Sequence, residues 1–140
     1  MLGVHMAQHL KTAGLTWKPR LGDRFSVPDR DLDDEVFVLS NMTIQVHERP
    51  DGRIIGFNGT TEWALDDVDL DEALWLPRED QLRELLGGTF RELRREPGGF
   101  RVRVDVLGQE HEFGAGTAEE AYAQALIHLL AAAGVFHPSE

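Results

Sequence analysis

Cysteine is absent from this 140-residue sequence, which excludes disulfide bonds, thiolate zinc sites and a cysteine nucleophile. Long apolar runs are absent as well, since no stretch approaches the roughly 18 apolar residues that a membrane-spanning helix needs. The opening residues, MLGVHMAQHLKTAGL, contain neither the apolar core nor the small-residue cleavage site of a secretory signal. We therefore expect a cytoplasmic protein that does not associate with membranes.

Positive charge is scarce in the sequence. Two lysines and twelve arginines stand against 25 acidic residues, and the net charge is −11. Proteins that bind nucleic acid or anionic lipid use dense positive charge, so the sequence argues against both kinds of partner. A basic protein partner fits the charge, and so does solubility alone.

Motifs for nucleophilic and nucleotide-dependent catalysis are also missing. Only three serines occur, and none lies in a G-x-S-x-G sequence. No phosphate-binding loop is present, and the glycines at 114–116 lack the third glycine and the βαβ setting of a dinucleotide site. We therefore predict a non-enzymatic role without a cofactor.

Hydrophobic periodicity predicts both helices and strands. Helical spacing of apolar residues covers 4–13, 78–86 and 117–133. Extended or alternating segments, typical of strands, cover 24–27, 36–40, 42–48, 53–57, 60–65, 89–96, 100–107 and 110–113. Gly14 fits a left-handed cap after the first helix, and Thr117 with Glu120 fits a capping box at the start of the last helix.

Turn residues indicate how these strands connect. Asn58-Gly59 is the strongest hairpin signal in the chain, because a type I′ turn needs positive φ at both central residues. Gly108-Gln109 is the predicted turn of a second hairpin. The strand 24–27, stopped by Pro28, is expected to lie at a sheet edge.

Together these elements predict one α+β domain over residues 1–140. An antiparallel sheet of about five to seven strands, arranged as a hairpin meander, would carry the two longer helices on one face, beside a short N-terminal helix. Buried contacts between sheet and helix are expected among Val102, Val104, Val106, Leu126 and Leu129.

The acidic segment WALDDVDLDEALWLPRED, residues 63–80, contains the candidate binding residues. These are Trp63, Asp66, Asp67, Asp69, Asp71 and Trp75. Hard cations are held by several oxygen ligands in a tight loop, and the alternating aspartates resemble such a set. No glycine lets the backbone curl around an ion, and Val68 and Leu70 interrupt the carboxylates. The sequence therefore favours an exposed acidic connection over a metal site.

The sequence leaves the role of the two tryptophans open and supports two further expectations. The two tryptophans fit either core positions or anchors for a partner. A second acidic stretch, DRDLDDE at 29–35, is expected to be an exposed loop that could meet a cation or a basic partner. Leu74 is expected to pin the acidic connection together with Trp63 and Trp75.

Histidines give two further candidate groups. His5 and His9 have a spacing that can bind zinc, but no third ligand is evident and we expect two exposed polar residues. His47 and His111 lie on the outward faces of predicted strands beside glutamates, and they would form one cluster if those strands pair.

Three stretches carry a resemblance that covers about half of the chain. They are LTWKPRLGDRFSVPDRDLDDEVFVLSNMT, GFNGTTEWALDDV and EALWLPREDQLRELLG, between Leu15 and Gly87. They resemble a family of small actinobacterial proteins of uncharacterised role, some of which are labelled as pilus-assembly proteins. A looser resemblance links the region from LWLPREDQLRELL to GTAEEAYAQALIHLL with small hypothetical proteins of bacteria and phages. The resemblance implies no catalytic residues.

Three functional hypotheses follow. The leading one is a small acidic binding or adaptor protein with a basic protein partner. The second is a divalent-metal-dependent enzyme that uses the carboxylates of 66–72 or 29–35. The third is an acidic mimic that occupies a nucleic-acid-binding protein. Convergence of the carboxylates on one point would separate the second hypothesis from the first.

Overall fold

The computed structural model describes residues 1–28, 32–40, 44–50, 52–57 and 67–134, with the backbone alone at 32–34, 44, 45, 47–49, 52, 54–57, 67 and 68. The chain divides into two compact units. Unit 1 comprises Met1–Thr16 and Pro77–Glu140, and unit 2 comprises Trp17–Leu76. The predicted α+β class is confirmed, whereas the single-domain organisation stays a prediction.

The expected single sheet is wrong. In the described part of the chain, the strands form three antiparallel sheets of three strands each, fewer per sheet than the five to seven expected. Two of these sheets belong to unit 2 and one belongs to unit 1. Among the described helices, none is long and apolar enough to cross a membrane.

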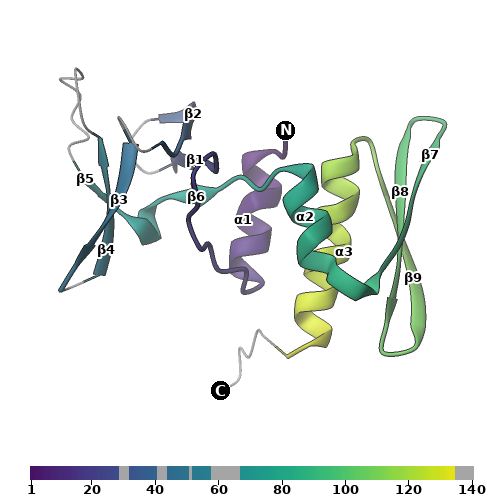
Figure 1. The fold of residues 1–140 in the computed structure, drawn as a ribbon. Helices are drawn as coiled ribbons and strands as arrows, with labels where there is room; N and C mark the ends of the chain where they lie inside the picture. Colours follow the sequence, from purple (N-terminus) through teal and green to yellow (C-terminus); the bar gives the residue numbers. More distant parts are fainter. Residues whose placement is uncertain (29–31, 41–43, 51, 58–66, 135–140) are drawn as a thin grey trace. The chain divides into compact units, whose positions relative to one another are not determined.

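Unit 1 is a three-stranded sheet with helices on one face (Figure 1). Its elements are α1 (Val4–Thr12), α2 (Glu79–Leu86), the short 3₁₀ helix η3 (Gly87–Thr89), β7 (Phe90–Glu96), β8 (Gly99–Val106), β9 (Gln109–Ala115) and α3 (Ala118–Ala132). The strand order is β7-β8-β9. Helix α3 lies against β8 and β9, and both α1 and α2 pack against α3. The three predicted helices are therefore present within one or two residues of their expected bounds.

The core of unit 1 forms where the alternating strand meets the apolar side of α3. Val102, Val104 and Leu126 are at most 2% exposed, Val106 is also buried, and Leu129 is half-buried. Four of the five residues expected in this contact are thus fully buried, which confirms the helix-on-sheet packing. The deepest positions of unit 1 also include Leu2, Leu10, Leu82, Leu86 and Tyr122.

Both predicted helix ends have the expected capping geometry. Gly14 adopts φ 114°, and its N–H donates to the Lys11 carbonyl while the Leu15 N–H donates to the Leu10 carbonyl. This pair of bonds is the Schellman arrangement. At the start of α3 the Glu120 N–H donates to the Thr117 hydroxyl at 3.1 Å, which satisfies one otherwise unpaired helix N–H.

The turn between β8 and β9 lies one residue earlier than predicted. Val106 pairs with Gln109, so the turn residues are Leu107 and Gly108, with φ 54° and 82°. Both values fit a type I′ turn. Leu107 is the one described non-glycine residue with positive φ, and its side chain is 87% exposed.

Replacing Leu107 with asparagine should therefore stabilise unit 1. A left-handed backbone costs an ordinary L-residue about 1–2 kcal/mol, and asparagine tolerates it better. We expect the free energy of unfolding to rise by up to about 1 kcal/mol, measured by urea denaturation. Leu107→Val serves as the control and should destabilise, because a branched side chain resists positive φ. Equal stability of all three proteins would contradict the assignment of this turn.

Unit 2 contains two small sheets. Its elements are β1 (Arg24–Val27), β2 (Leu32–Val38), β3 (Ile44–Arg49), β4 (Gly52–Phe57), β5 (Asp67–Asp69), the 3₁₀ helix η2 (Leu70–Glu72) and β6 (Leu74–Trp75). The strand orders are β2-β1-β6 and β3-β4-β5. The predicted turn Asn58-Gly59 and the predicted strand 60–65 lie outside the described residues.

Two expectations for unit 2 are wrong. Strand β1 is central in its sheet rather than at an edge, because Phe25, Ser26 and Val27 are all buried and both neighbouring strands pair with it. The predicted loop 29–35 is also shorter than expected, because residues 32–35 belong to β2. The Val27↔Leu32 pairing extends β2 into the acidic stretch.

Candidate functional site

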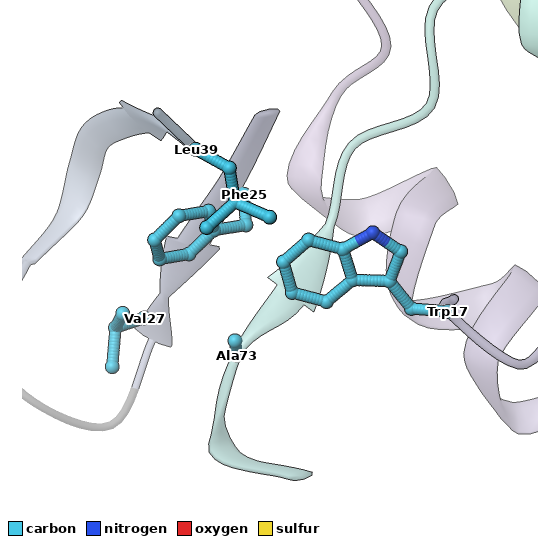
Figure 2. Close-up of a cluster of buried hydrophobic side chains, with 5 residues drawn as sticks. All are labelled: Trp17, Phe25, Val27, Leu39 and Ala73. Atoms are coloured by element: carbon cyan, nitrogen blue, oxygen red, sulfur yellow. The ribbon is translucent and has the colours of Figure 1, made fainter. Parts of the chain in front are cut away.

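Unit 2 contains a cluster of aromatic residues, and Figure 2 shows Trp17 and Phe25 of this cluster with the buried Val27, Leu39 and Ala73. Phe25 pairs with Phe37 on one side and with Trp75 on the other, so the three side chains share one face of the sheet. Trp17 closes this face, with its ring centroid 5.5 Å from Phe25 and 6.4 Å from Trp75. Val27, Leu39 and Ala73 complete the buried set.

A buried carboxylate fixes Trp17 in this cluster. Asp23 is 1% exposed, and its Oδ2 accepts hydrogen bonds from the Trp17 Nε1–H at 2.9 Å and from the Arg20 N–H at 3.0 Å. The Leu39 N–H donates to the Asp23 carbonyl. A buried carboxylate is tolerated when such donors replace water, so Asp23 organises the WKPRLGD segment structurally.

The structure places Trp75, a candidate binding residue, within the aromatic cluster. Its ring is nearly parallel to that of Trp17, with an interplanar angle of 12°, and the residue is half-buried. Its Nε1 is buried and has no hydrogen-bond partner among the described residues. Trp75 therefore packs against the buried cluster as a partly buried residue, while its role in binding stays a prediction.

The acidic segment is described only in part. Asp69 and Asp71 are exposed, and Asp67 lies in β5, where the backbone alone is described. The Asp69 N–H donates to the Glu72 carboxylate at 3.2 Å, which caps the short helix η2. Trp63 and Asp66 lie outside the described residues. The aspartates at 69 and 71 thus face water on a short strand-to-helix connection, as the sequence predicts for these two residues.

Metal ligation by the two acidic stretches stays untested. In the part of the chain that the structure describes, no group of three or more His, Cys, Asp or Glu residues is placed to hold a metal ion. Residues 29–31 and Asp66 lie outside that part, and so do the side chains of 32–34 and Asp67.

Charge is distributed unevenly between the two units. In unit 2, fourteen acidic and six basic residues give a net charge of −8, whereas eleven acidic and eight basic residues in unit 1 give −3. Unit 2 is also the shorter unit, with residues 17–76. The acidic character noted for the whole sequence therefore belongs mainly to unit 2.

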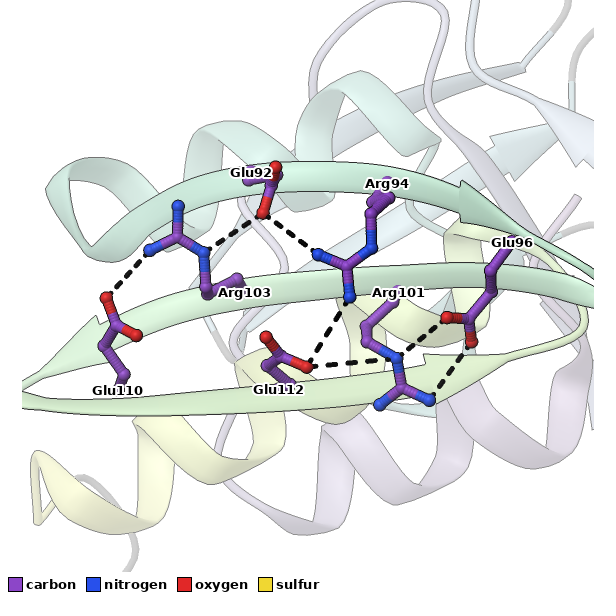
Figure 3. A network of polar contacts seen from close by, with 7 residues as sticks. All are labelled: Glu92, Arg94, Glu96, Arg101, Arg103, Glu110 and Glu112. Carbon is purple, nitrogen blue, oxygen red and sulfur yellow. Dashed lines mark hydrogen bonds and ion pairs between the residues drawn. The ribbon is translucent and has the colours of Figure 1, made fainter.

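An arginine–glutamate network covers the outer face of the unit 1 sheet (Figure 3). Its members are Glu92, Arg94, Glu96, Arg101, Arg103, Glu110 and Glu112. The strongest pair is bidentate, with Arg101 Nε and Nη2 at 3.0 and 3.1 Å from the two Glu96 carboxylate oxygens. Gly114 is paired with Arg101, and the guanidinium occupies the space that a side chain there would need.

The sequence analysis did not predict this network. The network depends on the register of β7, β8 and β9, which brings residues from three strands together. The alternating charges in β7 and β8 are the sequence signal that could have predicted the network. Three arginines offset three of the four glutamates, so the network has a net charge of −1.

The guanidinium of Arg101 lowers the pKa of Glu96, mainly through its hydrogen bonds and also through its charge. The folded pKa lies below the ordinary value of 4.5, so this pair contributes stability above pH 4.5. That contribution is lost as the pH falls through the lowered folded pKa. Arg101→Gln should return the Glu96 pKa toward its ordinary value, as measured by NMR titration of the carboxyl carbon. Arg91→Gln, on the same sheet, should leave it unchanged, and equal shifts in both variants would contradict the pairing.

Four histidines of unit 1 lie in two pairs. His5 and His9 are exposed on α1, with ring centroids 4.6 Å apart, as the sequence predicts. The condition for a cluster of His47 with His111 is not met, because β3 and β9 belong to different sheets. The predicted outward position of His111 is wrong, because His111 pairs with the buried Val104 and so lies on the helix-covered face. Instead, His111 lies 4.2 Å from His128 of α3, centroid to centroid.

The described candidate features are the aromatic cluster of unit 2, the exposed Asp69 and Asp71, and the ion-paired face of the unit 1 sheet. The chain matches no protein-family model, no curated protein and no solved structure.

Proposed function

We propose that the protein is a non-enzymatic binding or adaptor protein whose acidic unit 2 receives a basic protein partner. The observation that carries the proposal is the concentration of charge, −8 in unit 2 against −3 in unit 1. A surface that carries charge of one sign accelerates association with a partner of opposite charge and orients that partner. Unit 2 is therefore the part of the chain that we expect to attract a positively charged partner.

The contrast between the units strengthens this assignment. In unit 1, four glutamates of the outer sheet face form ion pairs with arginines of the same face. In unit 2, Glu35 and Asp69 are exposed. Carboxylates that face water can exchange solvent for a basic side chain at little desolvation cost, in contrast to buried ones.

The segment from Asp67 to Asp71 is the proposed contact. Trp75 follows it closely in sequence and stacks on Trp17, so one end of the segment is held by the aromatic cluster. A rigidly held surface loses less conformational entropy on binding than a mobile one. Trp63 and Asp66 are the remaining residues of the proposed surface.

The test is a pair of charge-matched variants. Asp67→Asn, Asp69→Asn and Asp71→Asn remove three charges from unit 2, and Glu79→Gln, Glu84→Gln and Asp105→Asn remove three from unit 1. Proteins captured from the source cells on the immobilised wild type would be purified and titrated with each variant. We expect the unit 2 variant to weaken binding of a basic protein at least tenfold, and added salt to weaken wild-type binding. Equal affinity of the two variants, or no salt dependence, would contradict the proposal.

Calorimetry separates this proposal from the metal-enzyme hypothesis. The wild type would be titrated with Ca²⁺, Mg²⁺ and Mn²⁺. Micromolar binding that disappears in the combined Asp67→Asn and Asp69→Asn variant would favour a divalent-metal-dependent enzyme instead. We expect no such binding, because apolar residues interrupt the carboxylates and no glycine allows the backbone to wrap an ion.

A further inference from the structure

Two histidines from different elements of unit 1 lie side by side. His111 of β9 and His128 of α3 have ring centroids 4.2 Å apart and planes inclined by 50°, and both residues are half-buried. Phe113 lies against both rings, at 6.5 Å from His111 and 5.6 Å from His128. We propose that His111 and His128 together bind one late transition-metal ion, Cu²⁺ or Ni²⁺, which links α3 to β9.

The packing of unit 1 holds this pair in place. His111 pairs with Val104, a buried residue on the helix-covered face of β8, so His111 points toward α3. His128 lies in α3, which packs against β8 and β9, and its ring contacts those of His111 and Phe113. The two rings therefore meet because sheet and helix pack, and little entropy remains to be lost when a metal joins them.

The rings lie close to the separation that a shared metal needs. Imidazole nitrogens bind a metal at about 2.0–2.1 Å, which places two adjacent rings on one ion at a centroid separation of roughly 4.5–5 Å. The observed 4.2 Å is shorter than this range, so the rings must move apart slightly when an ion binds. Two imidazoles with water in the remaining positions suit Cu²⁺ and Ni²⁺, which prefer tetragonal sites of nitrogen and oxygen ligands.

The arginines of β8 lie on the face of the sheet opposite to the histidine pair. Arg101 and Arg103 pair with Glu96, Glu92 and Glu110 on the outer face of the sheet, opposite to the face of Val104 and His111. The helix-covered face near the histidines thus receives no arginine from β8. No third His, Cys, Asp or Glu among the described residues joins the pair, so water would fill the other coordination positions.

The experiment compares two sets of histidine variants by calorimetry with CuCl₂, NiCl₂ and MgCl₂. In the first set, His111→Gln and His128→Gln are made singly. In the second, His5, His9, His47 and His137 are all replaced by glutamine, so that the proposed pair is retained. We expect one Cu²⁺ or Ni²⁺ per chain with micromolar affinity, at least tenfold weaker binding in each single variant, and unchanged binding in the fourfold variant.

A second measurement avoids dependence on the folding of any variant. Zn²⁺ is diamagnetic, so its weaker binding can be followed in the imidazole resonances of the wild type by NMR. The resonances of His111 and His128 should shift together, while those of His5 and His9 stay unchanged. Cu²⁺ should also raise the melting temperature of the wild type. The proposal is overturned if only His5 and His9 respond, or if Cu²⁺ binds no more tightly than Mg²⁺.

Discussion

Replacing Phe25 with alanine should lower the free energy of unfolding of unit 2 by about 3–5 kcal/mol. Phe25 is 0% exposed, and its ring lies between Phe37 and Trp75 in the sheet and beneath Trp17. Truncation removes the transfer free energy of the ring and leaves a cavity. The three surrounding rings are large and rigid, so they can fill that cavity only partly.

The measurement for Phe25→Ala is tryptophan fluorescence during urea denaturation. All three tryptophans lie in unit 2, so their emission reports this unit directly. Val38→Ala is the matched control, because Val38 lies in the same sheet but is 47% exposed. We expect the control to shift the midpoint only slightly. A similar midpoint for Phe25→Ala and Val38→Ala would show that the aromatic cluster does not stabilise unit 2.

Replacing Leu126 with alanine should destabilise unit 1 by roughly 2–5 kcal/mol. Leu126 is 2% exposed in α3, and α3 packs against β8, whose Val102 and Val104 are fully buried. For a unit of this size the melting temperature should fall by at least about 8 °C. The loss follows from the lost burial and from the cavity between helix and sheet.

Hydrogen exchange of the β8 amides is the most direct readout for Leu126→Ala. Those amides lie beneath the substituted side chain, and their protection should fall with the stability of unit 1. Leu85→Ala is the control, because Leu85 is a helical leucine of the same unit that is 39% exposed. An unchanged thermal melt for Leu126→Ala would contradict the packing of α3 on this sheet.

Local patterns in the sequence predict unit 1 better than unit 2. The alternation of residues 100–107 and the Thr117 cap are strong signals with a direct physical cause, and β8 and α3 follow them closely. In unit 2, the decisive contact is the pairing of Phe25 and Ser26 with Trp75 and Leu74. Strand β6 has two residues, too few for any periodicity, and its partner lies far away in the sequence.

The same reasoning explains what was missed in the candidate site. The exposure of Asp69 and Asp71 follows from interleaved apolar residues, a local signal. The inward position of Trp75 depends on its pairing with Phe25, and the neighbourhood of His111 and His128 depends on how α3 crosses the sheet. Such contacts join residues that are distant in sequence, and composition or spacing does not encode them.

The discontinuity of unit 1 sets the order in which the chain can complete its parts during synthesis. Helix α1 packs against α3. Residues 17–76, which form unit 2, separate the segment that contains α1 from the rest of unit 1 in the sequence. At about 5–20 residues per second, α3 follows α1 from the ribosome with a delay of roughly 5–20 s. During that interval the apolar side of α1, with Ala7 and Leu10, cannot yet pack against α3. Ribosome-bound chains of intermediate length should therefore be the state of this protein that most needs a chaperone.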